Sequence, residues 1–132
     1  MVHLCLDFEG VLIPEIWQCL AKEVNSDDLM LTTQDLKDYD ELMSLRMKVV
    51  NDKNIKLSDI QKIVKDIDPF DGAQEFLNWA RSKFQVTIVS DTFYELAWPL
   101  VEKLGYPSII CHNMIVENDK ITGYELRQPN NK

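Results

Sequence analysis

The chain has 132 residues, 45% of them hydrophobic, which suits one domain with a buried core. Its formal charge of −8, from 22 acidic and 14 basic residues without a basic stripe, argues against nucleic acid and anionic membranes as partners. No apolar run approaches the roughly 18 residues that a membrane span needs, and the apolar N-terminal stretch lacks the basic flank of a signal peptide, so we expect a soluble protein.

Three widely spaced cysteines stand in apolar surroundings: Cys5, Cys19 and Cys111. An odd number at these spacings is not typical of a disulfide framework or a metal site. Buried, reduced thiols are the favoured interpretation, and they predict a cytoplasmic location.

The first half of the chain predicts one strand followed by helices. Residues 2–7 form an apolar run typical of a buried strand, whereas residues 15–24 and 33–52 carry apolar side chains at helical spacing. Ser58 begins a capping-box pattern ahead of a third helix, which Pro69 ends.

The next segment predicts helix, strand and helix. Asp71 is expected to cap a helix that leads to an apolar strand at residues 86–89. The following helix reaches Leu104, and Pro99 must either kink it or open a second helix.

The remaining pattern completes a parallel α/β core. Residues 108–112 predict a third strand, and residues 114–127 predict a β-hairpin with a loop of about four residues. Strands alternating with helices favour a parallel sheet. We expect residues 1–14 and 69–132 to form the core, with residues 15–68 as a helical cap insert over the strand ends.

Reactive side chains follow two of the predicted strands. Asp7 and Glu9 come after the first, and Ser90 and Asp91 come after residues 86–89. Ligands bind at such carboxyl ends in open α/β sheets. An aspartate there can attack phosphorus, which makes Asp7 the candidate nucleophile. Glu9, two residues on, points to the same face and can act as the acid/base.

Phosphate chemistry at this edge would need further groups. Carboxylates beside a phosphate dianion require a hard cation, and their oxygens suit Mg²⁺. The Ser90 hydroxyl and nearby N–H groups can hold phosphoryl oxygens. Either motif alone is more typical of a solvated loop or a helix cap. Their occurrence after two strands of one sheet favours phosphoryl transfer.

Two charges on the predicted insert suggest an amino-acid ligand. Arg46 lies on an apolar helix face, where arginine is usually a snorkelling side chain or a surface ion pair. Together with Glu15, however, it suits a zwitterion. His3 and His112 are more typical of packing or surface residues than of catalysts.

The motifs resemble those of the haloacid dehalogenase (HAD) superfamily. Residues 5–17 resemble its first motif, more narrowly that of the phosphoserine phosphatase branch, which includes bifunctional phosphoserine phosphatase/homoserine phosphotransferase enzymes. Residues 88–95 resemble the second motif of that branch, residues 39–46 its helical cap, and residues 123–128 also fit. The resemblance covers essentially all 132 residues.

The resemblance implies a role for each matching residue. Asp7 would be the nucleophile that becomes phosphorylated and would ligate Mg²⁺. Glu9 would be the acid/base and would offer its main-chain carbonyl to the metal. Ser90 would bind phosphate, with help from N–H groups near Gly10 and Asp91.

The resemblance also implies a substrate, a phosphorylated amino acid such as phosphoserine. Glu15 and Arg46 would bind its amino-acid part, and Lys132 would neutralise its phosphate. The family pattern then continues with two more strands and a fourth motif that completes the magnesium site, and the sequence contains no such loop.

We therefore expect a truncated HAD-like fold with slow phosphatase activity. The alternative is a non-catalytic remnant that binds a ligand or another chain. Without further strands beside it, the strand at residues 2–7 would be an unpaired apolar edge, which predicts a homodimer or higher oligomer that covers it.

Overall fold

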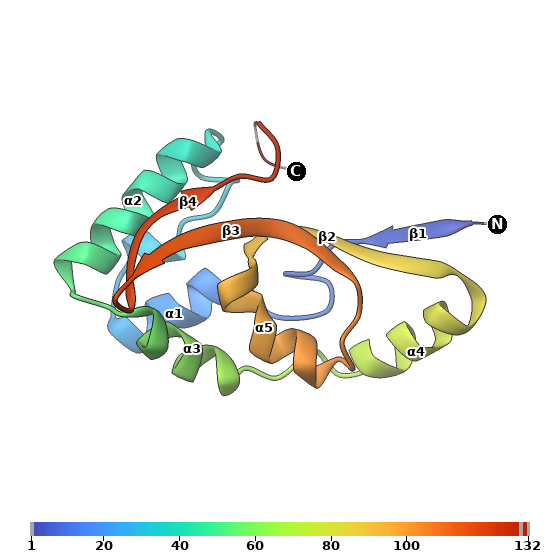
Figure 1. Ribbon diagram of the computed structural model, residues 1–132. Coiled ribbons are helices and arrows are strands. Elements are labelled where there is room, and N and C mark those ends of the chain that lie inside the picture. The colour runs from blue at the N-terminus through green and yellow to red at the C-terminus, as the bar shows by residue number, and fades with distance from the viewer. Residues whose placement is uncertain (1, 130, 132) are drawn as a thin grey trace.

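The computed structural model describes residues 2–129 and 131 and contains a four-stranded sheet in the order β1-β2-β3-β4. Strands β1, β2 and β3 are parallel, and β4 is antiparallel to β3 (Figure 1). The predicted α/β fold is confirmed. The elements are β1 (His3–Leu6), α1 (Ile16–Val24), the 3-10 helix η1 (Asp28–Met30), α2 (Tyr39–Asp52), α3 (Leu57–Lys65), α4 (Ala73–Lys83), β2 (Gln85–Phe93), α5 (Tyr94–Lys103), β3 (Ile109–Glu117) and β4 (Lys120–Glu125).

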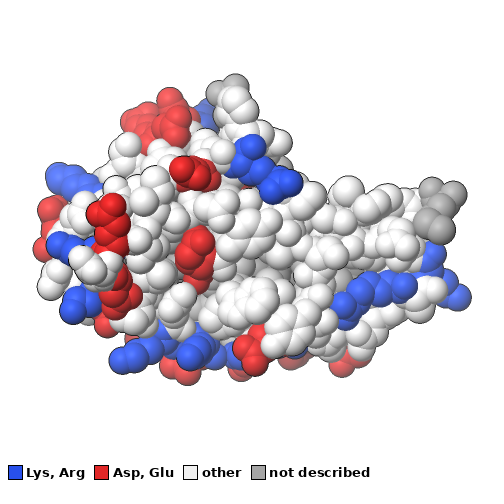
Figure 2. Space-filling view, in the orientation of Figure 1, with Lys and Arg blue, Asp and Glu red and all other residues white. Residues whose placement is uncertain are grey.

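Helices cover the sheet and enclose one core. Figure 1 shows α4 and α5 below the sheet and α2 beside β4, which it contacts. Ile88 and Phe93 from β2 and Leu96 and Leu100 from α5 are completely buried. Among the described residues, no helix is long and apolar enough to cross a membrane. On the face in Figure 2, basic side chains are scattered among acidic ones.

Strand β1 lies at the edge of the sheet and is less buried than predicted. Its residues alternate between exposed and half-buried, because it pairs with β2 on one side and the described residues place no strand on its other side. Cys5 is exposed, Cys19 is half-buried and Cys111 is buried. The prediction of a buried strand with buried thiols is therefore wrong for Cys5.

Helix α2 begins later than the predicted range 33–52. The Asp38 carboxylate accepts N–H groups of the first turn at 3.0 and 3.3 Å and so sets the helix start. Before it, Asp35 accepts the N–H of Thr32 at 2.9 Å in a separate turn. Local capping therefore overrides the apolar periodicity, which extends upstream of Tyr39.

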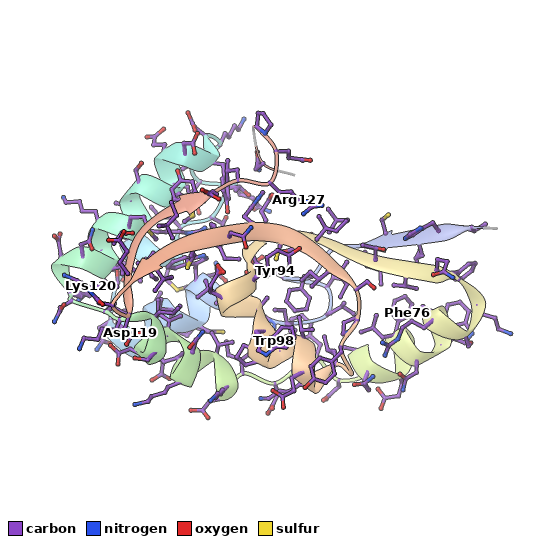
Figure 3. All side chains as sticks on the ribbon, in the orientation of Figure 1. Phe76, Tyr94, Trp98, Asp119, Lys120 and Arg127 are labelled. Carbon is purple, nitrogen blue, oxygen red and sulfur yellow. The ribbon has the colours of Figure 1, made fainter. Side chains whose placement is uncertain are left out.

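The N-terminus of α3 is capped by a distant segment. Asp59 accepts the N–H of Lys56, the residue before the helix, at 2.9 Å. Ser58 instead donates its N–H and its hydroxyl to Asp119, at 3.0 and 2.5 Å. Figure 3 shows Asp119 at the hairpin end, next to the start of α3. The predicted capping box that begins at Ser58 is wrong, because a tertiary contact takes its side chain.

Pro99 lies inside α5, which continues through it as one helix. Proline has no N–H, so the carbonyl of Glu95, four residues earlier, loses its helical partner. The side chain of Gln61 donates to this carbonyl at 3.0 Å. A residue of α3 thus supplies the hydrogen bond that Pro99 cannot make.

Two other boundaries also differ from prediction. Gly72, with φ of 85°, precedes α4 in place of the predicted cap Asp71, since glycine adopts this conformation without a steric cost. The third strand and the first hairpin strand are one continuous strand, β3. The hairpin turn has two residues rather than about four, Asn118 and Asp119, both with positive φ (50° and 65°).

Candidate active site

A cavity of about 220 Å³ lies where the carboxyl end of β1 meets β2 and the helical segments. This volume suits a small polar ligand. Six predicted site residues line it, while Gly10 does not and Lys132 lies outside the described residues. The lining residues are Asp7, Glu9, Glu15, Trp17, Thr32, Thr33, Gln34, Tyr39, Arg46, Ser90, Asp91 and Thr92.

Parallel pairing brings the two predicted motifs together. Leu6 lies opposite Ile88, so Asp7 leaves β1 beside the residues that precede Ser90. Asp7 is exposed, and its Oδ1 accepts the N–H of Phe8 at 2.8 Å. The N–H of Gly10 donates to the carbonyl of Ile13 at 2.7 Å, so it is used within the loop rather than directed at the cavity.

The second motif is a bulge within β2 rather than a segment after its end. Val89 pairs with Ile110, and Phe93 pairs with His112. An advance of four residues along β2 therefore corresponds to an advance of two residues along β3. The extra length displaces Ser90, Asp91 and Thr92 toward the cavity, as bulges do near active sites.

Hydrogen bonds hold the bulge and leave polar groups available. The Oγ of Ser90 accepts the N–H of Thr92 at 3.1 Å, so the Ser90 hydroxyl proton can point elsewhere. Thr92 Oγ1 is buried and has no hydrogen-bond partner among the described residues. Sequence reasoning missed Thr92, although its alternation with Ser90 along a strand places both on one side.

Glu9 is a half-buried residue whose carboxyl oxygen Oε1 is buried, and the carboxyl group of Glu15 lies beside it. Burial and, after it, the neighbouring Glu15 raise the pKa of Glu9 to about 8, whereas the charge of Arg46 acts in the opposite direction. Its Oε1 has no hydrogen-bond partner among the described residues. Glu9 therefore holds a proton at neutral pH and can donate it.

Arg46 is a buried cation that forms no ion pair with the described residues. It is 7% exposed, and the ion pairs of the described residues do not include it. Nη2 donates to the carbonyl of Leu31 at 3.4 Å, the guanidinium lies 5.0 Å from the centre of the Trp17 ring, and Nε is unpaired among the described residues. Burial lowers the pKa of Arg46. Trp17 is almost fully buried, lines the cavity and holds its ring against this cation.

Asp91 links the bulge to other elements. Its carboxylate contacts His112 Nε2 at 3.1 Å and accepts from Asn131 Nδ2 at 3.2 Å. Its main-chain carbonyl accepts the hydroxyl of Tyr39 at 2.5 Å. The prediction that His112 is a packing or surface residue missed this contact, because no sequence pattern relates His112 to Asp91.

In the part of the chain that the structure describes, the acidic residues at the cavity are Asp7, Glu9, Glu15 and Asp91. Within residues 2–129 and 131, no group of three or more histidine, cysteine, aspartate or glutamate side chains is arranged to hold a metal ion. Asp7 and Glu9, the two predicted ligands, both line the cavity. The described chain therefore offers part of an oxygen-ligand set.

Comparisons with known proteins show which family the chain resembles. The chain is 46% identical over 129 residues to phosphoserine phosphatase ThrH of Pseudomonas aeruginosa, covering 97% of this chain and 63% of that protein. It is also 46% identical to a phosphoserine phosphatase of Pseudomonas syringae pv. tomato, of which it covers 54%. The chain thus spans less than two thirds of the length of these relatives.

Among solved structures, a phospho-aspartyl intermediate analogue of a phosphoserine phosphatase has the same fold, with a TM-score of 0.73 at 22% identity over 94% of this chain and 62% of that one. A substrate-bound phosphoserine phosphatase complex gives a TM-score of 0.72 at 20% identity. The sequence model of the haloacid dehalogenase-like hydrolase family matches residues 9–132 of this chain. With its fold and its relatives in agreement, the chain belongs to the haloacid dehalogenase-like hydrolase family.

Proposed function

We propose that this chain hydrolyses phosphoserine through a phosphorylated Asp7. The observation that carries the proposal is a single cavity that combines an exposed aspartate, a proton-holding Glu9 and a buried Arg46 that forms no ion pair with the described residues. The names of its relatives, phosphoserine phosphatases, support the same substrate.

The proposed reaction has two displacements. An Asp7 carboxylate oxygen attacks phosphorus, the bond between phosphorus and the serine oxygen breaks, and Glu9 gives its proton to that oxygen. Water then attacks the phosphorus of the acyl phosphate and transfers a proton to Glu9, which releases phosphate and restores the Asp7 carboxylate. The raised pKa of Glu9 suits the first proton transfer.

Phosphate would be held by the bulge. The Ser90 hydroxyl proton, the Asp91 main chain and the unpaired Thr92 hydroxyl are the candidate donors. We keep Lys132 as the proposed cation that neutralises the phosphate. Gly10 would shape the loop after β1, since its φ of 79° is a left-handed conformation.

Mg²⁺ is the cofactor that we propose. It often binds through one or two carboxylates together with waters and substrate phosphate, which fits Asp7 and the main-chain carbonyl of Glu9. When bound, it would neutralise charge on the phosphoryl group. Because the described residues provide no group of three ligands, we expect weak binding.

The amino-acid part of the substrate would contact the helical segments. We propose residues 15–68 as a cap over the core formed by residues 1–14 and 69–132. In this cap, Arg46 would bind the substrate carboxylate and Glu15 its ammonium group. Both line the cavity.

The incomplete metal site favours a second candidate function, binding of the same ligand without turnover. Both candidates use Arg46, whereas turnover alone requires Asp7 as a nucleophile. A substitution of Asp7 therefore separates them.

Asp7→Asn should abolish phosphate release from L-phosphoserine in the presence of Mg²⁺, because an amide oxygen is a poor nucleophile. The measurement is steady-state phosphate release, with L-phosphoserine binding of both proteins as a control for intact folding. Equal rates for the two proteins would remove the aspartyl-phosphate mechanism. Binding without measurable release by the wild type would favour the second candidate.

Arg46→Met should raise the KM for phosphoserine by about 10- to 100-fold, since a hydrogen bond to a charged group contributes roughly 1.5–3 kcal/mol. O-phosphoethanolamine lacks the carboxylate, so its KM should change little in Arg46→Met. It serves as the matched control substrate. An equal rise for both substrates would contradict the assigned partner of Arg46.

Glu9→Gln should remove a pH-dependent loss of stability. A carboxyl group whose pKa rises from 4.5 unfolded to about 8 folded stabilises the fold below pH 4.5 and loses this contribution as the pH rises to 8. The free energy of unfolding in urea should therefore decline between pH 5 and 8 more in the wild type than in Glu9→Gln, by on the order of 3 kcal/mol. Glu23→Gln, at an exposed site, controls for the removed charge. If the free energy of unfolding depended on pH in the same way in the wild type and in Glu9→Gln, the raised pKa of Glu9 would be contradicted.

We also propose that a second copy covers the open edge of β1, since an unpaired strand edge is a template for pairing. Size-exclusion chromatography with light scattering should show a dimer or a higher oligomer. A compact monomer at micromolar concentration would count against this proposal.

A further inference from the structure

His112 lies directly across the ladder from the bulge that carries Ser90, Asp91 and Thr92. It pairs with Phe93, the first residue after the bulge, and is 2% exposed. Its ring packs on those of Phe93 and Tyr39, with centroid distances of 5.9 and 5.8 Å. The imidazole is thus held between β2 and the cap helix α2.

Both ring nitrogens have defined partners. Nδ1 accepts the main-chain N–H of Arg127, just after β4, at 2.9 Å. A nitrogen that accepts a hydrogen bond carries no proton, so the neutral ring must carry its proton on Nε2. Nε2 lies 3.1 Å from Asp91 Oδ1 and therefore donates to it. The Arg127 N–H fixes the tautomer that Asp91 requires.

The Asp91 carboxylate in turn fixes the bulge. Its other oxygen accepts from Asn131, and its main-chain carbonyl accepts from Tyr39, so the residue is held from three sides. A bulge has fewer ladder hydrogen bonds than a regular strand and needs such support. Ser90 and Thr92, the residues that face the cavity, are its immediate neighbours.

We propose that His112 is a positioning residue for the phosphate-binding bulge. Through a neutral Nε2–H tautomer selected by the Arg127 main chain, it orients Asp91 and thereby the donors on either side of Asp91. This inference rests on the proposed function for its effect on turnover. The tautomer and the effect on the bulge can be measured without turnover.

Two substitutions separate the two ring nitrogens. His112→Gln places an amide N–H near the position of Nε2 and loses the acceptor at Nδ1, whereas His112→Asn retains an acceptor near Nδ1 and cannot reach Asp91. His112→Asn should lower kcat/KM for phosphoserine by about 10- to 100-fold, as removal of an orienting partner does. His112→Gln should lower kcat/KM for phosphoserine clearly less than His112→Asn does. His3→Gln is the control, since His3 is exposed and contacts only Thr87 among the hydrogen bonds of the described side chains.

Nuclear magnetic resonance tests the same inference without activity. The chain has two histidines, so His3→Gln assigns the imidazole signals of His112. We expect Nε2–H in long-range proton–nitrogen spectra at pH 7, and main-chain amide shifts at residues 90–92 that change in His112→Asn more than in His112→Gln.

Each outcome has a distinct meaning. An Nδ1–H tautomer, or equal changes at residues 90–92 in the two variants, would overturn the positioning role. Equal kinetic losses, with matching falls in Tm, would reduce His112 to a packing residue. Wild-type protein that releases no phosphate would refute the proposed function alone, and the tautomer and amide shifts would still decide the role of His112.

Discussion

The candidate site depends on one mismatch in strand length. Between Val89 and Phe93, β2 is longer than the part of β3 that it faces, and the difference appears as a bulge. A regular ladder would place successive side chains on opposite faces of the sheet, so only alternate residues could approach Asp7. The bulge instead brings Ser90, Asp91 and Thr92 to one cavity. The hydrogen bonds of Asp91 with Tyr39, His112 and Asn131 hold this irregular backbone in place.

The cavity also contains buried polar atoms to which the described residues offer no hydrogen bond. Among the described residues, Glu9 Oε1, Arg46 Nε and Thr92 Oγ1 are buried and unpaired. Such atoms cost stability unless another group satisfies them, so their presence in one cavity suits a polar, anionic ligand. The face of the Trp17 ring attracts the Arg46 guanidinium and so offsets part of the cost of burying this charge, but the ring carries no negative charge. The fold thus places a cation, Arg46, and a carboxyl group with a raised pKa, Glu9, in the same cavity as Asp7.

Polar contacts connect the inserted helices to the rest of the chain. Tyr39 donates to the main chain of the bulge, Ser58 donates to Asp119 of the hairpin, and Gln61 completes the backbone hydrogen bonding of α5. Tyr124 of β4 adds a contact at 2.7 Å to an aspartate of α2. These contacts join the helices of residues 15–68 to the sheet and to α5, and a shift of these helices relative to the sheet would disturb the cavity that both line.

The sequence by itself determined the α/β order, the strand that Asp7 follows and the position of Arg46 on a helix, because each follows from a local pattern of apolar residues. Tertiary structure decided what those patterns cannot encode. Cys5 is exposed because β1 lies at the sheet edge, and the start of α3 is set by a hairpin residue distant in sequence. The role of His112 depends on a register shift between two strands, a relation between segments that neither segment specifies alone.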